Sequence, residues 1–331
     1  KETSQIIYLI SCVYFIIFTI GTQEFSYSLS KQAFFCYNIC MQFTFTLPES
    51  LPQMTVKQFL EEQLLIPRKI RHFLRIKKNI LINHEEVHWN ETVNPGDICQ
   101  LTFDEEDYPT KEILWGNPDL VQEVYQDQHL IIVNKPEGMK THGNQPNEIA
   151  LLNHVSAYVG QTCYVVHRLD METSGLVLFA KNPFILPILN RLLEKKEIAR
   201  EYWAVVEGQV GSKELIFRDK IGRDRHDRRK RVVDPKNGQY AETQVSRLKQ
   251  FPNKISLVRC KLKTGRTHQI RVHLSHHNFP ILGDPLYNSK SKTSRLMLHA
   301  FRLSFTHPLT LEQLSFTALS DTFEKELKQN G

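Results

Sequence analysis

The chain has 331 residues, of which 41% are hydrophobic and 24% are charged, and its formal net charge is +6. This is the composition of an ordinary globular protein with room for a large core and more than one domain. It has six cysteines, and no two of them form a Cys-x-x-Cys pair. This pattern argues against a disulfide framework and against a cysteine-based zinc site. It is compatible with a reducing cytoplasm.

Basic residues gather in two separate stretches. Residues 67–78 hold six lysines and arginines and no acidic residue. Residues 218–231 hold eight basic residues against three aspartates. Two such clusters favour a polyanion that contacts the protein in two places, whereas a single cluster would indicate only a solvated face.

Residues 1–41 differ in character from the rest. Residues 6–20 are almost entirely apolar, but this run of 15 residues is shorter than the roughly 20 that a membrane-spanning helix needs. The first methionine is Met41, and ordinary domain sequence follows it directly. We therefore expect translation to start at Met41, so that residues 1–40 of this atypical extension lie outside the native protein; the alternative is a membrane anchor.

Residues 42–104 have the pattern of a small α/β module. Residues 42–47 alternate like a strand, Thr55 is placed to cap one helix, and Pro67 fits the first turn of a second helix. The following basic residues should share one face of that second helix, an arrangement that suits contact with phosphates: Arg68, Arg71, Arg75 and Lys78. With its Pro-Gly-Asp turn before residues 98–103, the module resembles the S4 RNA-binding domain, although His84 stands where that family usually has glycine.

The same module contains the sequence His84-Glu85-Glu86-Val87-His88, which satisfies the His-Glu-x-x-His pattern of zinc proteases. That chemistry requires a helix, so that both histidines project from one side. The flanking residues alternate as strands do, and a Pro-Gly turn soon ends the segment. We therefore expect no zinc site here.

Residues 105–120 are acidic and turn-prone, which predicts a linker, and residues 121–325 then form the larger domain. Within it the sequence predicts a buried strand in 124–136 that ends at Lys135-Pro136, and further strands at 161–166, 177–180, 199–208 and 257–262. It also predicts helices at 147–159 and 183–197, and a basic hairpin over 215–248 with a turn at 234–238. Thr267 should lie near the start of another helix. We expect His273, His276 and His277 to face the surface or RNA, because no carboxylate accompanies them at ligand spacing.

Four blocks of this domain match a known family when taken together. They are Lys135-Pro136-x-Gly138, His167-Arg168-Leu169-Asp170-x-x-Thr173-Ser174-Gly175, Glu201-Tyr202-x-Ala204, and Thr264–His273 followed by Gly283-Asp284-Pro285. In this order and spacing, over residues 121–320, they resemble the RluA-type pseudouridine synthases. The resemblance implies an α+β fold with a mixed, mainly antiparallel sheet. It also implies an enzyme that detaches uracil from C1′ of a uridine in RNA, rotates it and rejoins it through C5.

The resemblance also implies roles for individual residues. Asp170 would be the essential carboxylate, with Arg271 as its ionic partner and Tyr202 packing on the target base. Residues that would bind the substrate are Arg168, Thr173, Arg266 and His268. Residues of the hairpin that would grip RNA are Arg223, Arg228, Arg229 and Arg231.

The implied partner is RNA, most often large-subunit rRNA in this family, with tRNA as an alternative target. A different class also stays open, namely a non-catalytic S4-type protein that binds RNA or assists ribosome assembly. We expect no metal, no nucleotide cofactor and no membrane association, and a monomer in the cytoplasm. Sequence leaves open whether Asp170 attacks the sugar, attacks the base or removes a proton.

Overall fold

The computed structural model describes residues 41–109, 112–145, 147–288 and 293–329. The expectations about residues 1–40, including the apolar run, lie outside these residues. Within the described part, no helix is both long enough and apolar enough to cross a membrane.

The first module is built on a four-stranded sheet in the order β1-β6-β3-β4. Its elements are β1 (Met41–Thr46), β2 (Met54–Thr55), α2 (Val56–Gln58), the π-helix η1 (Phe59–Gln63), α3 (Arg68–Ile76), β3 (Ile80–Ile82), β4 (Glu85–Glu86), β5 (Thr92–Val93) and β6 (Ile98–Phe103). Thr55 caps α2 through a capping box with Gln58, as its sequence predicts. Pro67 lies one position outside the first turn of α3, at its N-cap.

The His-Glu-x-x-His segment forms a hairpin turn and a strand. Asn83 and His84 both adopt positive φ angles, 53° and 69°, as the two central residues of a tight hairpin turn require. Glu85 and Glu86 then form β4, which pairs with β3. The prediction that this motif is not helical is therefore confirmed.

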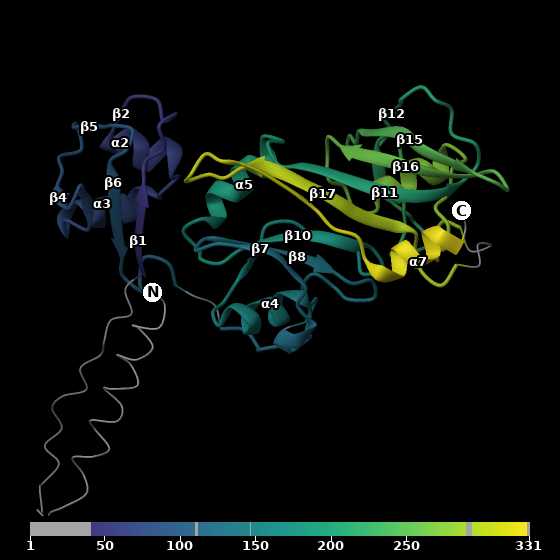
Figure 1. Cartoon of the computed structure of the whole chain (residues 1–331), viewed down its shortest axis with the longest axis horizontal. Coiled ribbons are helices and arrows are strands. Elements are labelled where there is room, and N and C mark those ends of the chain that lie inside the picture. Colours follow the sequence, from purple (N-terminus) through teal and green to yellow (C-terminus); the bar gives the residue numbers. More distant parts are fainter. Residues whose placement is uncertain (1–40, 110–111, 146, 289–292, 330–331) are drawn as a thin grey trace, which may run out of the picture. The chain divides into compact units, whose positions relative to one another are not determined.

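The larger domain is built on a ten-stranded sheet in the order β12-β15-β16-β11-β17-β10-β8-β7, with β18 on β17 and β9 on β10 (Figure 1). Its strands are β7 (Glu123–Gln126), β8 (Leu130–Lys135), β9 (Tyr164–Val165), β10 (Ser174–Ala180), β11 (Ala199–Glu207), β12 (Leu215–Phe217), β15 (Thr243–Phe251), β16 (Ile255–Leu262), β17 (Leu298–Thr306) and β18 (Gln313–Thr317). Among the strands of the described residues, β10 and β17 alone pair in parallel, over two residues. The expected mixed, mainly antiparallel α+β fold is confirmed.

Helices and one separate hairpin complete this domain. They are the 3-10 helix η2 (Pro118–Leu120), α4 (Leu151–Val159), α5 (Leu186–Glu194), the hairpin β13 (Ile221–Arg223) with β14 (Arg231–Val233), α6 (Gln269–His276) and α7 (Asp321–Gln329). In Figure 1, α4 lies next to the sheet. Apolar residues of α4, such as Leu151 and Val155, belong to the same buried cluster as Val133 and Phe179 of the sheet.

The centre of the sheet is buried on both sides. Every residue of β8 and β10 is buried, so their near-continuous apolar runs match strands that are covered on both faces. Gly175, at the start of β10, has φ +117° and a Cβ there would lie 2.4 Å from the carbonyl oxygen of Ala300. Only glycine fits this junction of β10 with β17.

Several predicted boundaries were wrong. The helix expected from 147 begins at Leu151, and the strand expected over 161–166 is the two-residue β9. The ends of the predicted 215–248 hairpin do pair, as β12 with β15, but the segment between them holds a shorter hairpin, β13–β14, which turns through residues 224–230 and was not predicted. Residues 234–238 form a second turn after it, in which the side chain of Asp234 accepts backbone hydrogen bonds from Lys236 and Asn237.

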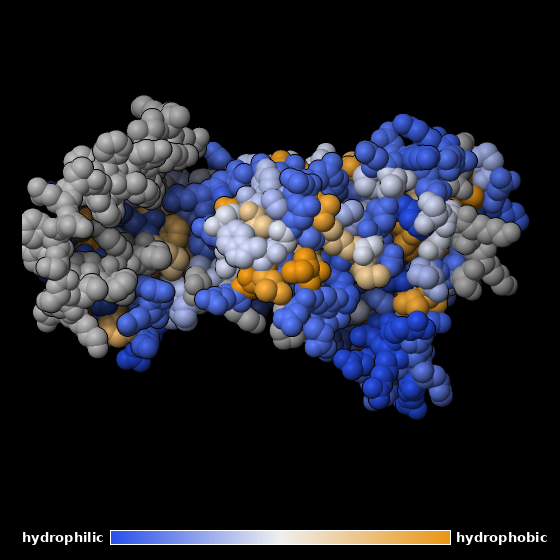
Figure 2. All heavy atoms as spheres, turned by 90° about the horizontal axis from the view of Figure 1, so that it is seen from below, coloured by the Kyte–Doolittle hydropathy of each residue, from blue (hydrophilic) through white to orange (hydrophobic). Residues whose placement is uncertain are grey.

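The face drawn in Figure 2 is predominantly hydrophilic, with apolar side chains in small separate patches. Large exposed apolar side chains among the described residues include Ile76 and Trp115, 61% and 58% exposed. Scattered apolar residues of this kind are normal on a globular surface and do not define an interface by themselves.

Candidate active site

Asp170 lies on the loop between β9 and β10. The neighbouring Leu169 is buried, and its backbone exchanges hydrogen bonds with the hydroxyl of Thr141 at 3.0 and 3.1 Å. The backbone N–H of Thr173 donates to the carbonyl of Asp170 at 3.1 Å, closing a turn. The backbone is therefore fixed on both sides of the carboxylate, whose side chain is 27% exposed.

Arg271, on α6, holds two carboxylates. Its Nη1 lies 3.3 Å from Oδ2 of Asp170, while Nε and Nη2 form a two-pronged pair with Asp284, each at 2.8 Å. Burial alone would lower the pKa of Arg271, but the hydrogen bonds to Asp284 and the charges of Asp284 and Asp170 raise it above its ordinary value. The guanidinium is thus a permanent cation that pairs with the carboxylates of both Asp284 and Asp170.

Tyr202 lies on β11 at a bulge, where the register with β17 shifts between Glu201 and Tyr202. Its side chain is 5% exposed, and burial raises its pKa. The hydroxyl is therefore protonated at neutral pH. A bulge that re-aims a side chain toward a pocket is a frequent device beside active sites.

His268 lies against the same carboxylate, with Nε2 3.7 Å from Oδ2 of Asp170. It is the N-cap of α6 and adopts φ 57°, a left-handed conformation that is uncommon for a residue with a side chain and recurs at functional sites. Its Nδ1 lies 2.9 Å from the hydroxyl of Tyr287. Burial lowers the pKa of His268, so the ring is neutral at pH 7.

These groups lie at the floor of a large cleft. An inner pocket of about 80 Å³ is lined by Asp170, Tyr202, Arg271, His268 and Thr173, among others. A wider cleft of about 1200 Å³ shares the Asp170 loop with it. Basic side chains that line the wider cleft are Lys140, Arg168, Lys196, Arg200, Lys263 and Arg266. A cleft with this excess of positive charge suits a phosphate-bearing ligand.

The structure brings the predicted substrate-binding residues to these pockets. Arg168 is exposed, lines both pockets, and lies 3.3 Å from His142 through its Nη1, so it is not the partner of Asp170. Thr173 is 2% exposed, and its hydroxyl has no hydrogen-bond partner among the described residues. Arg266 is exposed at the cleft wall, where its Nε donates to the carbonyl of Tyr240.

Three residues of the site escaped the sequence reasoning. Asp284 is fully buried and pairs with Arg271, and Arg200 lines both pockets. Lys135 is fully buried, and its ammonium donates to the carbonyls of Pro136, Met139 and Met171, the last on the Asp170 loop. Asp284 and Lys135 could have been predicted as site residues because they occur in the motif blocks. For Arg200, the only indication in the sequence is its position two residues before Tyr202.

Not all of the basic residues that were predicted to bind RNA are exposed and unpaired. Arg68 and Arg75 are exposed on α3, but Arg71 is buried and pairs with Glu61. The expectation that Arg71 shares the exposed face is therefore wrong, because the spacing alone does not show that η1 supplies a carboxylate beside it. Lys78 is exposed too, but it lies beyond the end of α3 and pairs with Glu86 at 2.7 Å.

On the β13–β14 hairpin, Arg223 and Arg228 are exposed. Arg229 is also exposed but pairs with Asp227 at 2.8 Å. Arg231 is half-buried and donates to the carbonyls of Arg228 and Lys230, while its backbone N–H donates to Tyr287. Tyr287 therefore links the hairpin to His268, and its ring lies 5.2 Å from the guanidinium of Arg271.

The histidines of α6 also differ from expectation. His273 is fully buried, with Nδ1 2.8 Å from the hydroxyl of Thr243, so it faces neither the surface nor RNA. His276 and His277 do have a companion carboxylate, Asp219, which is distant in sequence and near in space. The argument that no carboxylate accompanies them is therefore wrong.

The fold, with an aspartate paired to a buried arginine beside a cleft rich in basic side chains, is matched in known proteins by the pseudouridine synthases, a class of RNA-modifying enzymes. The family model for RNA pseudouridylate synthases matches residues 129–276, and the model for the N-terminal domain of the RluD ribosomal pseudouridine synthase matches residues 43–99.

Relatives agree with this assignment. The chain is 39% identical over 71% of its length to the uncharacterized RNA pseudouridine synthase YhcT of Bacillus subtilis, of which it covers 79%. It is 41% identical over 59% of its length to the ribosomal large subunit pseudouridine synthase D of Neisseria meningitidis, of which it covers 57%. The structure of human RNA pseudouridylate synthase domain containing 4 superposes with a TM-score of 0.52 at 25% identity, covering 63% of this chain and 92% of the human one. The chain belongs to the RNA pseudouridine synthase family, the isomerases that convert uridine to pseudouridine in RNA.

Proposed function

We propose that Asp170 is the catalytic carboxylate of this enzyme, with Arg271 and Tyr202 as its partners. The observation that carries the proposal is the chain Asp170–Arg271–Asp284 at the floor of the cleft. Asp284 satisfies one side of the buried guanidinium, and the remaining Nη1 is left to hold the carboxylate of Asp170 beside the open pocket. A carboxylate held in this way can serve as a nucleophile or as a base.

The chemistry requires few groups. The N1–C1′ bond of uridine breaks, the uracil rotates, and a C5–C1′ bond forms; C5 then loses its proton and N1 gains one. No net oxidation occurs, so the reaction requires no redox cofactor. Asp170 assists cleavage at C1′, while Tyr202, aimed into the inner pocket, packs on the base and holds it during the rotation.

The target base must first leave its stack, at a cost of a few kcal/mol. Arg168 is exposed at the entrance and lines both pockets, so it fills the space that the base vacates. Thr173, Arg266 and His268 line the inner pocket and orient the nucleotide. The neutral His268 ring leaves Arg271 as the cation in contact with Asp170.

RNA is held by two modules in this proposal. Residues 42–104 form an S4-like RNA-binding domain, 105–120 a linker, and 121–325 the catalytic domain. Arg68, Arg75 and Lys78 on the first module, and Arg223 and Arg228 on the hairpin, supply exposed charge for phosphates. We place the enzyme in the cytoplasm, as a monomer.

The target we propose is large-subunit rRNA. Supporting it are the match of residues 43–99 to the N-terminal domain model of a ribosomal enzyme and the name of the Neisseria relative. A tRNA target is the alternative. A purely RNA-binding role is less well supported, because the cleft brings together all three proposed catalytic side chains.

Mapping pseudouridines in cellular RNA, by carbodiimide adducts and primer extension, tests the proposal. A strain that lacks the gene should lose at least one large-subunit rRNA site, and wild-type enzyme should restore it while Asp170→Asn should not. Loss of a tRNA site alone would overturn the target, and loss of no site would overturn the enzyme proposal.

A further inference from the structure

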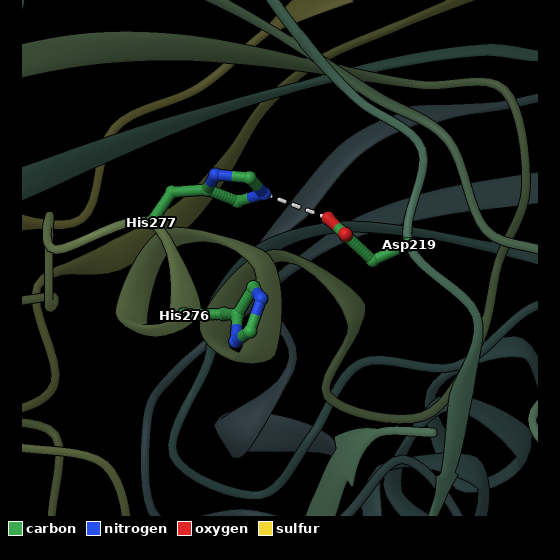
Figure 3. A group of neighbouring side chains, drawn as sticks. All are labelled: Asp219, His276 and His277. Atoms are coloured by element: carbon green, nitrogen blue, oxygen red, sulfur yellow. Dashed lines mark hydrogen bonds and ion pairs between the residues drawn. The ribbon is translucent and has the colours of Figure 1, made fainter. Parts of the chain in front are cut away.

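A second cluster of ligand-type side chains lies outside the active site. His276 is the last residue of α6 and His277 follows it, while Asp219 lies between β12 and β13. Figure 3 shows the two histidines at the end of the helix, with Asp219 reaching toward His277 from a separate segment. Nothing in the proposed isomerisation uses these three residues.

The three side chains are within reach of one ion. Nε2 of His277 lies 2.7 Å from Oδ2 of Asp219, and one ligand atom from each residue lies within 4.8 Å of the others. A tetrahedral zinc ion with bonds of about 2.0–2.1 Å keeps its ligands about 3.3 Å apart. Changes of up to about 1.5 Å in the distances between the ligand atoms would therefore suffice. The side chains of His277 and Asp219 are 35% and 23% exposed, so an ion has access.

The surroundings orient the cluster. The ring of His277 stacks on Phe217 of β12, with centroids 4.0 Å apart and an interplanar angle of 5°. The buried His273 has Nε2 3.2 Å from the backbone carbonyl of Asp219, which ties that segment to the helix. Both candidate histidines lie at the C-terminal end of α6, where the helix dipole favours a cation.

We propose that Asp219, His276 and His277 bind one divalent transition-metal ion, of which Zn²⁺ is the best fit, with water in the fourth position. Two imidazoles and one carboxylate suit zinc, whereas magnesium and calcium prefer sites made only of oxygen. The ion would cross-link the segment that enters the β13–β14 hairpin to α6, the helix that carries Arg271. Because the site is outside the cleft, this inference does not depend on the proposed isomerisation.

The test is a metal titration of the full chain after it has been stripped with a chelator. The wild type should bind one equivalent of Zn²⁺ in competition with a chromophoric chelator, and Co²⁺ should give the visible absorption of a tetrahedral site. Zinc should also raise the melting temperature, because it binds the folded state. His277→Ala and Asp219→Asn should each weaken binding at least about tenfold.

A matched control removes two exposed histidines that are elsewhere, His84→Ala with His88→Ala, and should leave binding unchanged. His276→Ala is the second ligand variant, because its exposed side chain can be removed without loss of the fold, as circular dichroism would verify. Absence of zinc binding in the wild type, or equal loss in the His84/His88 control, would overturn the proposal. Pseudouridine mapping is independent of all these outcomes.

Discussion

Arg271 is able to hold two carboxylates because its guanidinium offers donors in a fixed fork. Nε and Nη2 are used by Asp284, and Nη1 contacts Asp170. A lysine carries the same charge but presents it at one point, so it cannot bridge both partners with this geometry.

Arg271→Lys should therefore lower single-turnover rates by about 100-fold, the loss expected for a misplacement near 1 Å. Arg247→Lys is the matched control, since Arg247 is exposed and donates to the carbonyl of Val210; it should keep the wild-type rate. A rate within twofold of wild type for Arg271→Lys would show that the fork is dispensable.

Buried histidines make the stability depend on pH. Burial lowers the pKa of His167 to about 3 and that of His299 to about 4, and Nε2 of His167 accepts from the backbone N–H of Leu178. The unfolded chain therefore binds more protons below pH 6.5, so the free energy of unfolding falls as pH falls from there toward the folded pKa values.

His167 alone should cost roughly 3 kcal/mol of stability between pH 6.5 and pH 4. His167→Gln keeps an acceptor for Leu178 without a titrating group, so urea unfolding should show a shallower decline with acid. His88→Gln, on the exposed surface, should leave the slope unchanged. If His167→Gln has the wild-type slope, another group controls the acid sensitivity.

At the scale of single residues, the motif blocks and the family that they resemble predicted Asp170, Tyr202 and Arg271 as one group, and these three side chains do line one pocket. Asp284 and Lys135 also lie inside such blocks, but each contacts a group in the folded protein that is distant in sequence. Lys135 reaches the carbonyl of Met171, and no local pattern reports that contact. Asp219 was missed beside the α6 histidines for the same reason.

At the scale of elements, the junction of β10 with β17 positions the start of the strand that follows the Asp170 loop. Gly175 combines φ +117° with a close backbone approach that leaves no room for a Cβ. The strand itself was predictable from its apolar run, whereas this junction requires knowledge of a strand more than 100 residues later.

Gly175→Ala should destabilise the protein by about 3 kcal/mol or more through strain and displacement of β17. Gly211→Ala is the control, because a Cβ there meets nothing within 4 Å and no positive φ is involved. Thermal and urea unfolding would measure both. Equal stability of the two variants would contradict the proposed constraint.

Element boundaries were less predictable than element types. The 147–159 helix starts late because Asn153 caps the backbone N–H of Ala150, and the basic hairpin turns at 224–230 because Asp224 accepts from the N–H groups of His226 and Asp227. In both places a local hydrogen bond between a side chain and the backbone sets where the element begins or turns. Hydrophobic periodicity does not report such bonds.

At the scale of the whole molecule, RNA binding is expected to rest on exposed cations rather than on all the basic residues of each cluster. Arg223 and Arg228 are exposed, whereas Arg229 is paired with Asp227. Removing a side chain that binds one phosphate should reduce the slope of log affinity against log salt by about 1.

Arg223→Ala with Arg228→Ala should therefore weaken binding to rRNA and lower the salt slope by about 2. Arg229→Ala should have a smaller effect because its charge is already partly balanced. Filter binding between low and physiological salt would measure both. If the Arg229 variant is weakened as much as the double variant, the hairpin acts only through its net charge.

The most direct test of the central proposal follows the hydrogen at C5, which must leave if uracil is rejoined through that carbon. Large-subunit rRNA labelled with [5-³H]uridine, taken from cells that lack the gene, is incubated with wild-type enzyme or Asp170→Asn. The wild type should release tritium to water in proportion to the target uridines, and Asp170→Asn should release none while still binding RNA with the wild-type salt dependence. Tritium release by Asp170→Asn at the wild-type rate would contradict the catalytic role of Asp170.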